Sequence, residues 1–371
     1  MTASLDLKQL RSELDAAGRP WEMDENTSMA LLTEDQRVMR LGVTPPPGEL
    51  TLEEAVKADA AAPTVTQDMI AAESGFGTLA AFDHRNVGGK NYTTDVQDQG
   101  ACGSCVAFGV VAVMETTYRR QIDNPSFKID LSEAHLFYCH GGEEGRTCQN
   151  GWWPDKALDK ASEKGVTLES VYPYTGSQQA CQVGSGWQNN LAKVTGRTHL
   201  NSRAKMKNWI ATRGSITGCF IVYQDFFSYR SGVYKHVSGN AAGGHCVEII
   251  GYNDAQGCWI CKNSWGKNWG EGGFFRIAYG ECQIETWAGP WGANGIGLRM
   301  WNTNARIRGL WSNSAERNAW VFVQGAGWRK LANESSAMQH ALVLQTLAAK
   351  GSNRPVNILE DNQVVRELYV L

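Results

Sequence analysis

The 371-residue chain lacks any apolar run approaching the roughly 18 residues that a helix needs to span a bilayer, so no membrane span is expected. It also lacks an excess of one charge. With 35 basic and 38 acidic residues, the formal net charge of −3 gives no reason to expect nucleic acid or an anionic membrane as a partner. The first residues lack the basic start and apolar core of a secretory signal.

Cysteine is missing from residues 1–79 and again after residue 293. The ten cysteines between these limits favour secretion or another oxidising compartment, because disulfides persist there. The absent signal sequence points the other way. A trimmed leader, another export route or reduced thiols would each reconcile the two observations, so the localisation stays open.

Composition divides the chain into three parts: 1–79, 80–293 and 294–371. Leucines at roughly helical spacing near Leu10, and a possible helix cap at Thr33, indicate short helices in the first part. Glycine, aromatic residues and cysteine dominate the second. The third alternates as strands do around a helix over 335–350 that Gly351 should end, which predicts a small α+β domain of unknown role. We expect its tryptophans to lie in its core; they are Trp301, Trp311, Trp320 and Trp328.

A nucleophile is predicted where a loop of small residues, 100–104, runs into an apolar helix that begins at Cys105. The free N–H groups and dipole of a helix N-terminus favour the thiolate, which is the reactive form of cysteine. Such a nucleophile needs a base and a group that orients the base. His245 and Asn263 are the candidates downstream, and together they predict a cysteine peptidase.

These motifs resemble those of papain-like cysteine peptidases. The stretch 99–108 reads QGACGSCVAF and the stretch 262–270 reads KNSWGKNWG, with His245 between them at close to that family's spacing. The run 232–245, and residues 274–285, resemble the cathepsin B branch. The likeness implies an α+β fold of two lobes, one helical and one β-barrel-like, with a substrate cleft between them.

The resemblance also implies roles. Cys105 would attack the scissile carbonyl, His245 would exchange the proton, and Asn263 would orient the imidazole, while Gln99 would stabilise the oxyanion. By the same analogy, Cys102 pairs with Cys148 and Cys139 with Cys181. Substrate contacts are expected from Gly151, Trp152, Gly244, Trp265, Trp269 and Trp287. No cofactor is expected, and Cys258 and Cys261 lack the second ligand pair that a zinc site needs.

Some residues depart from the family pattern. Val106 replaces the tryptophan that usually follows the nucleophile. Trp152 replaces a glycine at the cleft edge, so its ring should lean into the cleft or point to solvent. Trp287 should close the floor of the S2 pocket, which predicts small side chains at P2. No histidine-bearing occluding loop is apparent after Cys181, and this absence predicts an endopeptidase.

The sequence as a whole predicts an endopeptidase zymogen that acts on proteins or peptides. Residues 1–79 would be its propeptide and intramolecular inhibitor, cleaved near 75–82. Two alternatives share the fold: a peptide ligase that uses the same thioester, and a catalytically silent binding protein. A transglutaminase-like deamidase would use a Cys-His-Asp triad, and the sequence around Asn263 argues against it.

Overall fold

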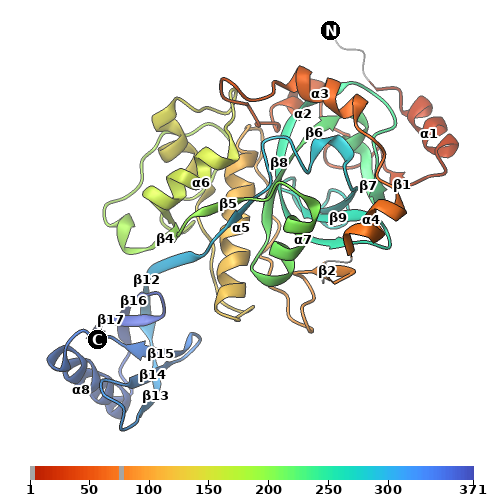
Figure 1. The fold of residues 1–371 in the computed structure, drawn as a ribbon. Helices are drawn as coiled ribbons and strands as arrows, with labels where there is room; N and C mark the ends of the chain where they lie inside the picture. Colours follow the sequence, from red (N-terminus) through yellow and green to blue (C-terminus); the bar gives the residue numbers. More distant parts are fainter. Residues whose placement is uncertain (1–4, 75–78) are drawn as a thin grey trace.

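The computed structural model of the chain describes residues 5–74 and 79–371 and shows a two-lobed body with a smaller C-terminal unit beside it (Figure 1). The content is mixed α+β, as expected. Among the helices of these residues, none is long and apolar enough to cross a membrane. The predicted cleavage region near 75–82 falls partly on 75–78, outside the described residues.

The N-terminal segment, residues 5–74, is built from short helices and one strand. Two helices begin with capping boxes, in which Thr33 pairs with Gln36 and Thr51 with Glu54, so the exposed N–H groups of the first turn are satisfied locally. The elements are α1 (Leu7–Ala16), β1 (Trp21–Met23), α2 (Glu34–Val38), α3 (Leu52–Ala61) and α4 (Gln67–Ser74).

Strand β1 anchors this segment to the body. It lies antiparallel to β7 (Tyr229–Tyr234), with Trp21 opposite Gly232. The Trp21 ring is buried, and its indole N–H donates to the Lys235 carbonyl at 2.8 Å. The buried aromatic side chain and the backbone pairing therefore hold the N-terminal segment against the strand lobe.

The helical lobe is organised around α5, whose residues from Cys105 through Tyr118 are all buried. Two disulfides, Cys102–Cys148 and Cys139–Cys181, link the loops of this lobe. Its elements are α5 (Cys105–Gln121), the π-helix η1 (His135–Gly141), η2 (Gly142–Glu144), α6 (Pro154–Glu163), β3 (Val166–Thr167), η3 (Trp187–Asn189) and β4 (Leu191–Val194).

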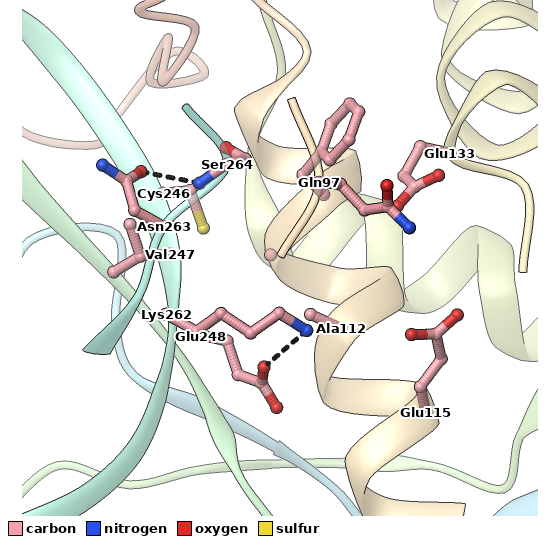
Figure 2. Close-up of a pocket in the computed structure, with 12 residues that line it drawn as sticks. Gln97, Ala112, Glu115, Glu133, Cys246, Val247, Glu248, Lys262, Asn263 and Ser264 are labelled. Carbon is pink, nitrogen blue, oxygen red and sulfur yellow. Dashed lines mark hydrogen bonds and ion pairs between the residues drawn. The ribbon is translucent and has the colours of Figure 1, made fainter. Parts of the chain in front are cut away.

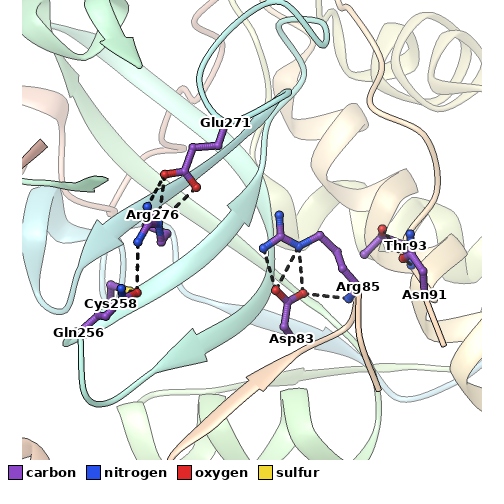
Figure 3. Close-up of polar contacts among 8 residues, drawn as sticks. All are labelled: Asp83, Arg85, Asn91, Thr93, Gln256, Cys258, Glu271 and Arg276. Carbon is purple, nitrogen blue, oxygen red and sulfur yellow. Dashed lines mark hydrogen bonds and ion pairs between the residues drawn. The ribbon is translucent and has the colours of Figure 1, made fainter. Parts of the chain in front are cut away.

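The strand lobe is a nine-stranded sheet in the order β1-β7-β10-β9-β8-β6-β11-β5, with β2 paired to β8. Arg85 binds Asp83 at the end of β2, and Arg276 of β10 joins Glu271 to Gln256 (Figure 3). Besides β7, the elements are β2 (Ala81–Asp83), β5 (Arg197–His199), α7 (Arg203–Thr212), β6 (Ile216–Tyr223), η4 (Gln224–Ser228), β8 (Ala241–Asn253), β9 (Cys258–Lys262), β10 (Phe274–Ala278), η5 (Glu281–Gln283) and β11 (Trp291–Ala293).

The tail, residues 294–371, continues a sheet of the helical lobe. The order is β13-β14-β15-β17-β16-β12-β4-β3, and Ile296 of β12 lies opposite Val194 of β4. A separate apolar core forms beneath α8. The elements are β12 (Ile296–Ala305), β13 (Ile307–Ser312), β14 (Ala319–Val323), β15 (Gly327–Leu331), α8 (Ser336–Ser352), β16 (Val356–Asp361) and β17 (Val364–Val370).

Two expectations for the tail are wrong. Helix α8 runs past Gly351 and ends at Ser352, and Asn353 follows it as the C-cap in the left-handed conformation. Trp311 and Trp328 are 48% and 47% exposed, so they do not lie in the core. Side chains along a strand alternate between the two faces of the sheet, which explains the error. Residues such as Val321 point into the core, and the tryptophan rings lie on the opposite face.

A buried ion pair lies within the tail. The Arg329 guanidinium is 2.6 Å from the Glu360 carboxylate, and each side chain is only 4% exposed. We predict that Glu360→Leu destabilises the tail by about 3–5 kcal/mol, because it leaves the Arg329 charge buried without its partner. Urea unfolding followed by tryptophan fluorescence measures the loss. Glu316→Leu, at an exposed glutamate of the tail, is the control, and equal midpoints for the two variants would contradict the prediction.

Candidate active site

The candidate nucleophile, Cys105, is the first residue of α5 and is fully buried. Its sulfur is a free thiol, because the neighbouring Cys102 is bonded to Cys148. The loop before the helix is fixed by Tyr174, whose hydroxyl donates to the Gln99 carbonyl at 2.8 Å. The thiol therefore lies at a helix N-terminus on a constrained loop, as the sequence predicts.

The candidate base and its orienting group come from the strand lobe. His245 lies on β8, and Asn263 directly follows β9. The His245 Nε2 and Asn263 Oδ1 atoms are 2.7 Å apart, and the Trp265 ring lies 4.6 Å from the imidazole. His245 Nδ1 is buried and has no hydrogen-bond partner among the described residues. This nitrogen is available to exchange a proton with a nucleophile.

Gln99 is the predicted oxyanion donor, and its side-chain N–H groups are occupied here. Its Nε2 donates to the Arg40 carbonyl at 3.0 Å and to the Cys102 carbonyl at 2.8 Å. Its Oε1 accepts from the Ser264 hydroxyl at 2.7 Å, which fixes the orientation of the amide. A carbonyl of the N-terminal segment thus binds the donor that was predicted to bind the developing oxyanion.

The backbone of residues 40–44 crosses the site between the lobes. The N–H groups of Gly42 and Val43 both donate to the Gly244 carbonyl, at 3.0 and 3.1 Å. On the other side, the Trp152 N–H donates to the Gly42 carbonyl at 2.8 Å, and the Thr44 N–H returns a bond to the Trp152 carbonyl at 3.1 Å. The segment is held by main-chain groups from both lobes.

The fit at Gly42 leaves no room for a side chain. A Cβ atom on Gly42 would lie 1.9 Å from the Gly103 carbonyl oxygen, and one on Gly151 would lie 2.1 Å from the Gly42 carbonyl oxygen. Glycine at both positions therefore permits the two backbones to approach each other. Gly42 could not be replaced without moving the segment out of the site.

Burial changes the charge state of both reactive groups. It raises the pKa of the Cys105 thiol to about 12 and lowers the pKa of His245 to about 4, although the hydrogen bond that the Asn263 side-chain oxygen accepts opposes the second shift. Water is excluded from both groups, so the charged forms lose solvation. At neutral pH the covered site therefore holds a neutral thiol and a neutral imidazole.

The predicted substrate-binding residues do not all face the cleft. Gly151, Gly244 and the Trp152 backbone contact the N-terminal segment, as described above. The Trp152 ring, however, is fully buried against Phe137 and donates its N–H to Glu144 at 3.0 Å. Neither predicted orientation is correct, because the helical lobe provides an aromatic neighbour and a carboxylate for this side chain.

The remaining predicted aromatic residues are also buried. Trp287 donates its indole N–H to the Leu50 carbonyl of the N-terminal segment at 3.0 Å. Trp265 covers His245, and Trp269 packs behind Trp265 at 5.0 Å in an aromatic cluster of the strand lobe. Sequence reasoning missed the roles of Ser264, Tyr174 and Arg40, although Ser264 follows Asn263 directly and was within the motif.

A small cavity of about 20 Å³ lies between the lobes behind this site (Figure 2). Lys262 Nζ donates to Thr94 at 2.9 Å and is 3.4 Å from the Glu248 carboxylate. Glu115 of α5 accepts from Thr94 and from the Leu131 N–H, and burial raises its pKa to about 7. This polar network joins α5 to β8 and β9, and so helps to set the distance between the lobes.

Part of the chain is similar in sequence to two cathepsin-like proteins. The chain is 37% identical to the cathepsin B-like CP3 of Giardia intestinalis over 208 residues, 52% of this chain and 67% of that protein. It is 36% identical to a cathepsin L-like proteinase of Fasciola hepatica over 192 residues, 50% and 57% of the two chains. The matched part thus spans between about half and two thirds of these relatives' lengths.

Among solved structures, procathepsin B S9 from Trypanosoma congolense matches with a TM-score of 0.62 at 22% identity, over 78% of this chain and 98% of that one. This likeness shows the fold. In addition, the sequence model described as papain family cysteine protease matches residues 79–289. The chain therefore belongs to the papain family of cysteine proteases.

Proposed function

We propose that the chain is a cysteine endopeptidase made as an autoinhibited zymogen. Residues 80–293 are its peptidase domain, residues 1–79 are its inhibitory segment, and residues 294–371 are a C-terminal domain of unassigned role. The observation that carries the proposal is a hydrogen bond from the Gln99 side-chain amide to the Arg40 carbonyl of the N-terminal segment. The same amide would assist the Cys105 thiol in catalysis.

The proposed mechanism starts when the N-terminal segment leaves. Re-entry of water lowers the thiol pKa and raises that of the imidazole, so a proton moves from Cys105 to His245 Nδ1. The thiolate attacks the substrate carbonyl, while Gln99 Nε2 and the Cys105 N–H stabilise the oxyanion. His245 then protonates the leaving amine, with Asn263 holding its ring, and water hydrolyses the acyl-enzyme.

The proposed inhibition uses the same groups. Residues 40–44 bind the Gly244 carbonyl and both backbone groups of Trp152, which are the hydrogen-bonding positions that an extended substrate needs. Arg40 adds an ion pair with Asp98 at 2.8 Å. The solved procathepsin B named above is likewise a precursor form, which agrees with an inhibitory role for this segment.

The shape around Trp287 supports a preference for small side chains at P2. A Cβ placed on Gly244 would meet the Trp287 ring at 2.4 Å and the Val43 Cβ at 2.9 Å, so both lie close beside this glycine. The indole thus fills space next to the site, and valine is the side chain that the N-terminal segment places there. The ligase alternative shares every one of these residues, and only analysis of the products separates it from hydrolysis.

Acid should trigger processing. The backbone N–H and the hydroxyl of Thr51 donate to the Glu54 carboxylate at the start of α3, and these hydrogen bonds lower the pKa of Glu54. A carboxylate with a lowered pKa stabilises the folded N-terminal segment above its ordinary value of 4.5, and this contribution is lost as the pH falls through the lowered pKa. We predict that the unmutated protein, followed by mass, loses about 80 N-terminal residues on acidification from pH 6.5 to below 4 and then takes up a thiol-reactive epoxide at Cys105.

The Cys105→Ala variant is the control for this experiment and should stay intact at every pH. If the unmutated protein neither shortens nor takes up the epoxide after its N-terminal segment is removed by another protease, then the chain is a binding protein with a silent papain-like fold.

A substitution in the inhibitory segment should release activity early. We predict that Gly42→Ala raises the peptidase activity of the unprocessed protein at neutral pH, because its Cβ cannot fit against Gly103. The activity after processing should equal that of the unmutated protein, since the altered residue is then gone. Gly184→Ala, at a glycine with open space around it, is the matched control. Equal neutral-pH activity of Gly42→Ala and this control would refute autoinhibition by residues 40–44.

Substrate choice gives a further test. A peptide library with varied P2 residues should be cleaved best at valine or alanine and poorly at arginine, and a protein substrate should be cut internally. Trp287→Ala should extend the preference to larger P2 side chains, whereas Trp311→Ala, at an exposed tryptophan of the tail, should not. Arginine favoured at P2, or release of C-terminal dipeptides alone, would contradict the proposal.

A further inference from the structure

Three of the six unpaired cysteines of the described residues meet beside the candidate active site. They are Cys105 on α5, Cys219 on β6 and Cys246 on β8. Cys246 directly follows His245 in the sequence, and all three side chains are fully buried. The mechanism proposed above uses only Cys105, so the other two thiols have no role in it.

Cys219 and Cys246 occupy directly opposed positions on two antiparallel strands. Opposed residues in such a pair have Cα atoms about 4.5–5.5 Å apart, and disulfides span about 4.4–6.8 Å. Both side chains leave the sheet on the same face, and burial, followed by the neighbouring Cys246, raises the pKa of Cys219 well above its ordinary value. A disulfide can therefore close between them without displacement of the backbone.

Cys246 also lies near the nucleophile. After burial, its proximity is the second cause that raises the pKa of the Cys105 thiol. Its own sulfur is directed toward α5 (Figure 2) and lies 3.1 Å from the position that a Cβ on Gly109 would occupy. Gly109 is one helical turn beyond Cys105, so the Cys246 sulfur lies along the same side of the helix as the nucleophile.

We propose that Cys246 and Cys219 are a resolving pair that returns an oxidised Cys105 to its thiol form. The proposal rests on the nucleophilic role of Cys105 given above, and its oxidant is a hydroperoxide such as hydrogen peroxide.

The chemistry runs in three balanced steps. The Cys105 thiolate attacks the peroxide, so an S–O bond forms, the O–O bond breaks and hydroxide leaves to become water. Cys246 attacks the resulting sulfenic acid; an S–S bond forms, the S–O bond breaks, and a second water departs with the Cys246 proton. Cys219 then attacks the Cys246 sulfur and expels the Cys105 thiolate. One peroxide and two thiols yield one disulfide and two waters.

Access explains why the pair depends on the nucleophile. Neither Cys219 nor Cys246 has a surface through which a peroxide in solution could reach it, and burial raises the pKa of Cys219 well above its ordinary value. Once the N-terminal segment has left, the Cys105 sulfur is the member of the cluster that faces the substrate cleft. Oxidation therefore enters at Cys105 and passes inward.

The test uses processed protein and hydrogen peroxide at one equivalent. After treatment, free thiols are alkylated and the protein is digested without reduction by trypsin and a glutamate-specific protease, which separate Cys246 from Cys258 by cutting after Glu248. We expect a cross-linked pair of peptides that contains Cys219 and Cys246, together with peptidase activity that returns without added reductant.

Variants separate the steps. Cys219→Ala should stop as an inactive Cys105–Cys246 disulfide that dithiothreitol reverses. Cys246→Ala should stop as an inactive Cys105 sulfenic acid that dimedone labels, because no neighbouring thiol intercepts it and one equivalent of peroxide takes a thiol no further. Cys105→Ala, freed of its N-terminal segment by another protease, should form no Cys219–Cys246 bond. The matched control is Cys258→Ala, which removes a buried free thiol beside Gln256, at the end of β9 away from Asn263 (Figure 3). It should behave as the unmutated protein.

Two results would overturn the relay. One is recovery of both Cys219 and Cys246 as alkylated thiols from peroxide-treated protein, and the other is an equal yield of their disulfide in Cys105→Ala. Failure of the proposed function has a different signature, since an inactive protein without epoxide uptake at Cys105 is recognised before any peroxide is added.

Discussion

The close approach of helix α5 to strand β8 is the contact on which the site depends. It brings the helix that begins at Cys105 against the strand that carries His245, and Gly109 makes it possible, because a Cβ there would lie 3.1 Å from the Cys246 sulfur and 3.4 Å from the Val247 carbonyl. The buried network of Lys262 and Glu115 holds the same interface a little further inside. The candidate nucleophile, base and orienting amide are thereby positioned by packing that precedes any substrate.

Exclusion of water is the second constraint. The N-terminal segment covers Cys105 and His245 with backbone alone at Gly42, and both groups become neutral in response. A side chain of the N-terminal segment at this position would need a matching pocket. The main-chain N–H and carbonyl groups of the segment need none, because they bind at the positions that any extended peptide would use. In the proposed function, inhibition and substrate binding consequently draw on the same donors and acceptors, so departure of the segment would end the first and permit the second.

The tail attaches by a different principle. Strand β12 hydrogen-bonds to β4 of the helical lobe on one side and to β16 on the other, so a single sheet passes from the body into the C-terminal unit. The unit nevertheless has its own core under α8. Its aromatic residues gather on the uncovered face, where Trp311 lies opposite Trp320 and Phe322 opposite Trp328.

The sequence by itself determined the family and the helix that begins at Cys105. It marked His245, Asn263 and Gln99 as candidate catalytic residues, because each of their motifs is short and contiguous. It also predicted the helix start at Thr33, where the capping box is purely local. Only the tertiary structure decided that the Gln99 amide meets the carbonyl of Arg40, that the Trp152 ring turns into the helical lobe, and that Cys219 faces Cys246. Those contacts join residues far apart in the chain, and their geometry follows from sheet register and interlobe packing, which no local pattern encodes.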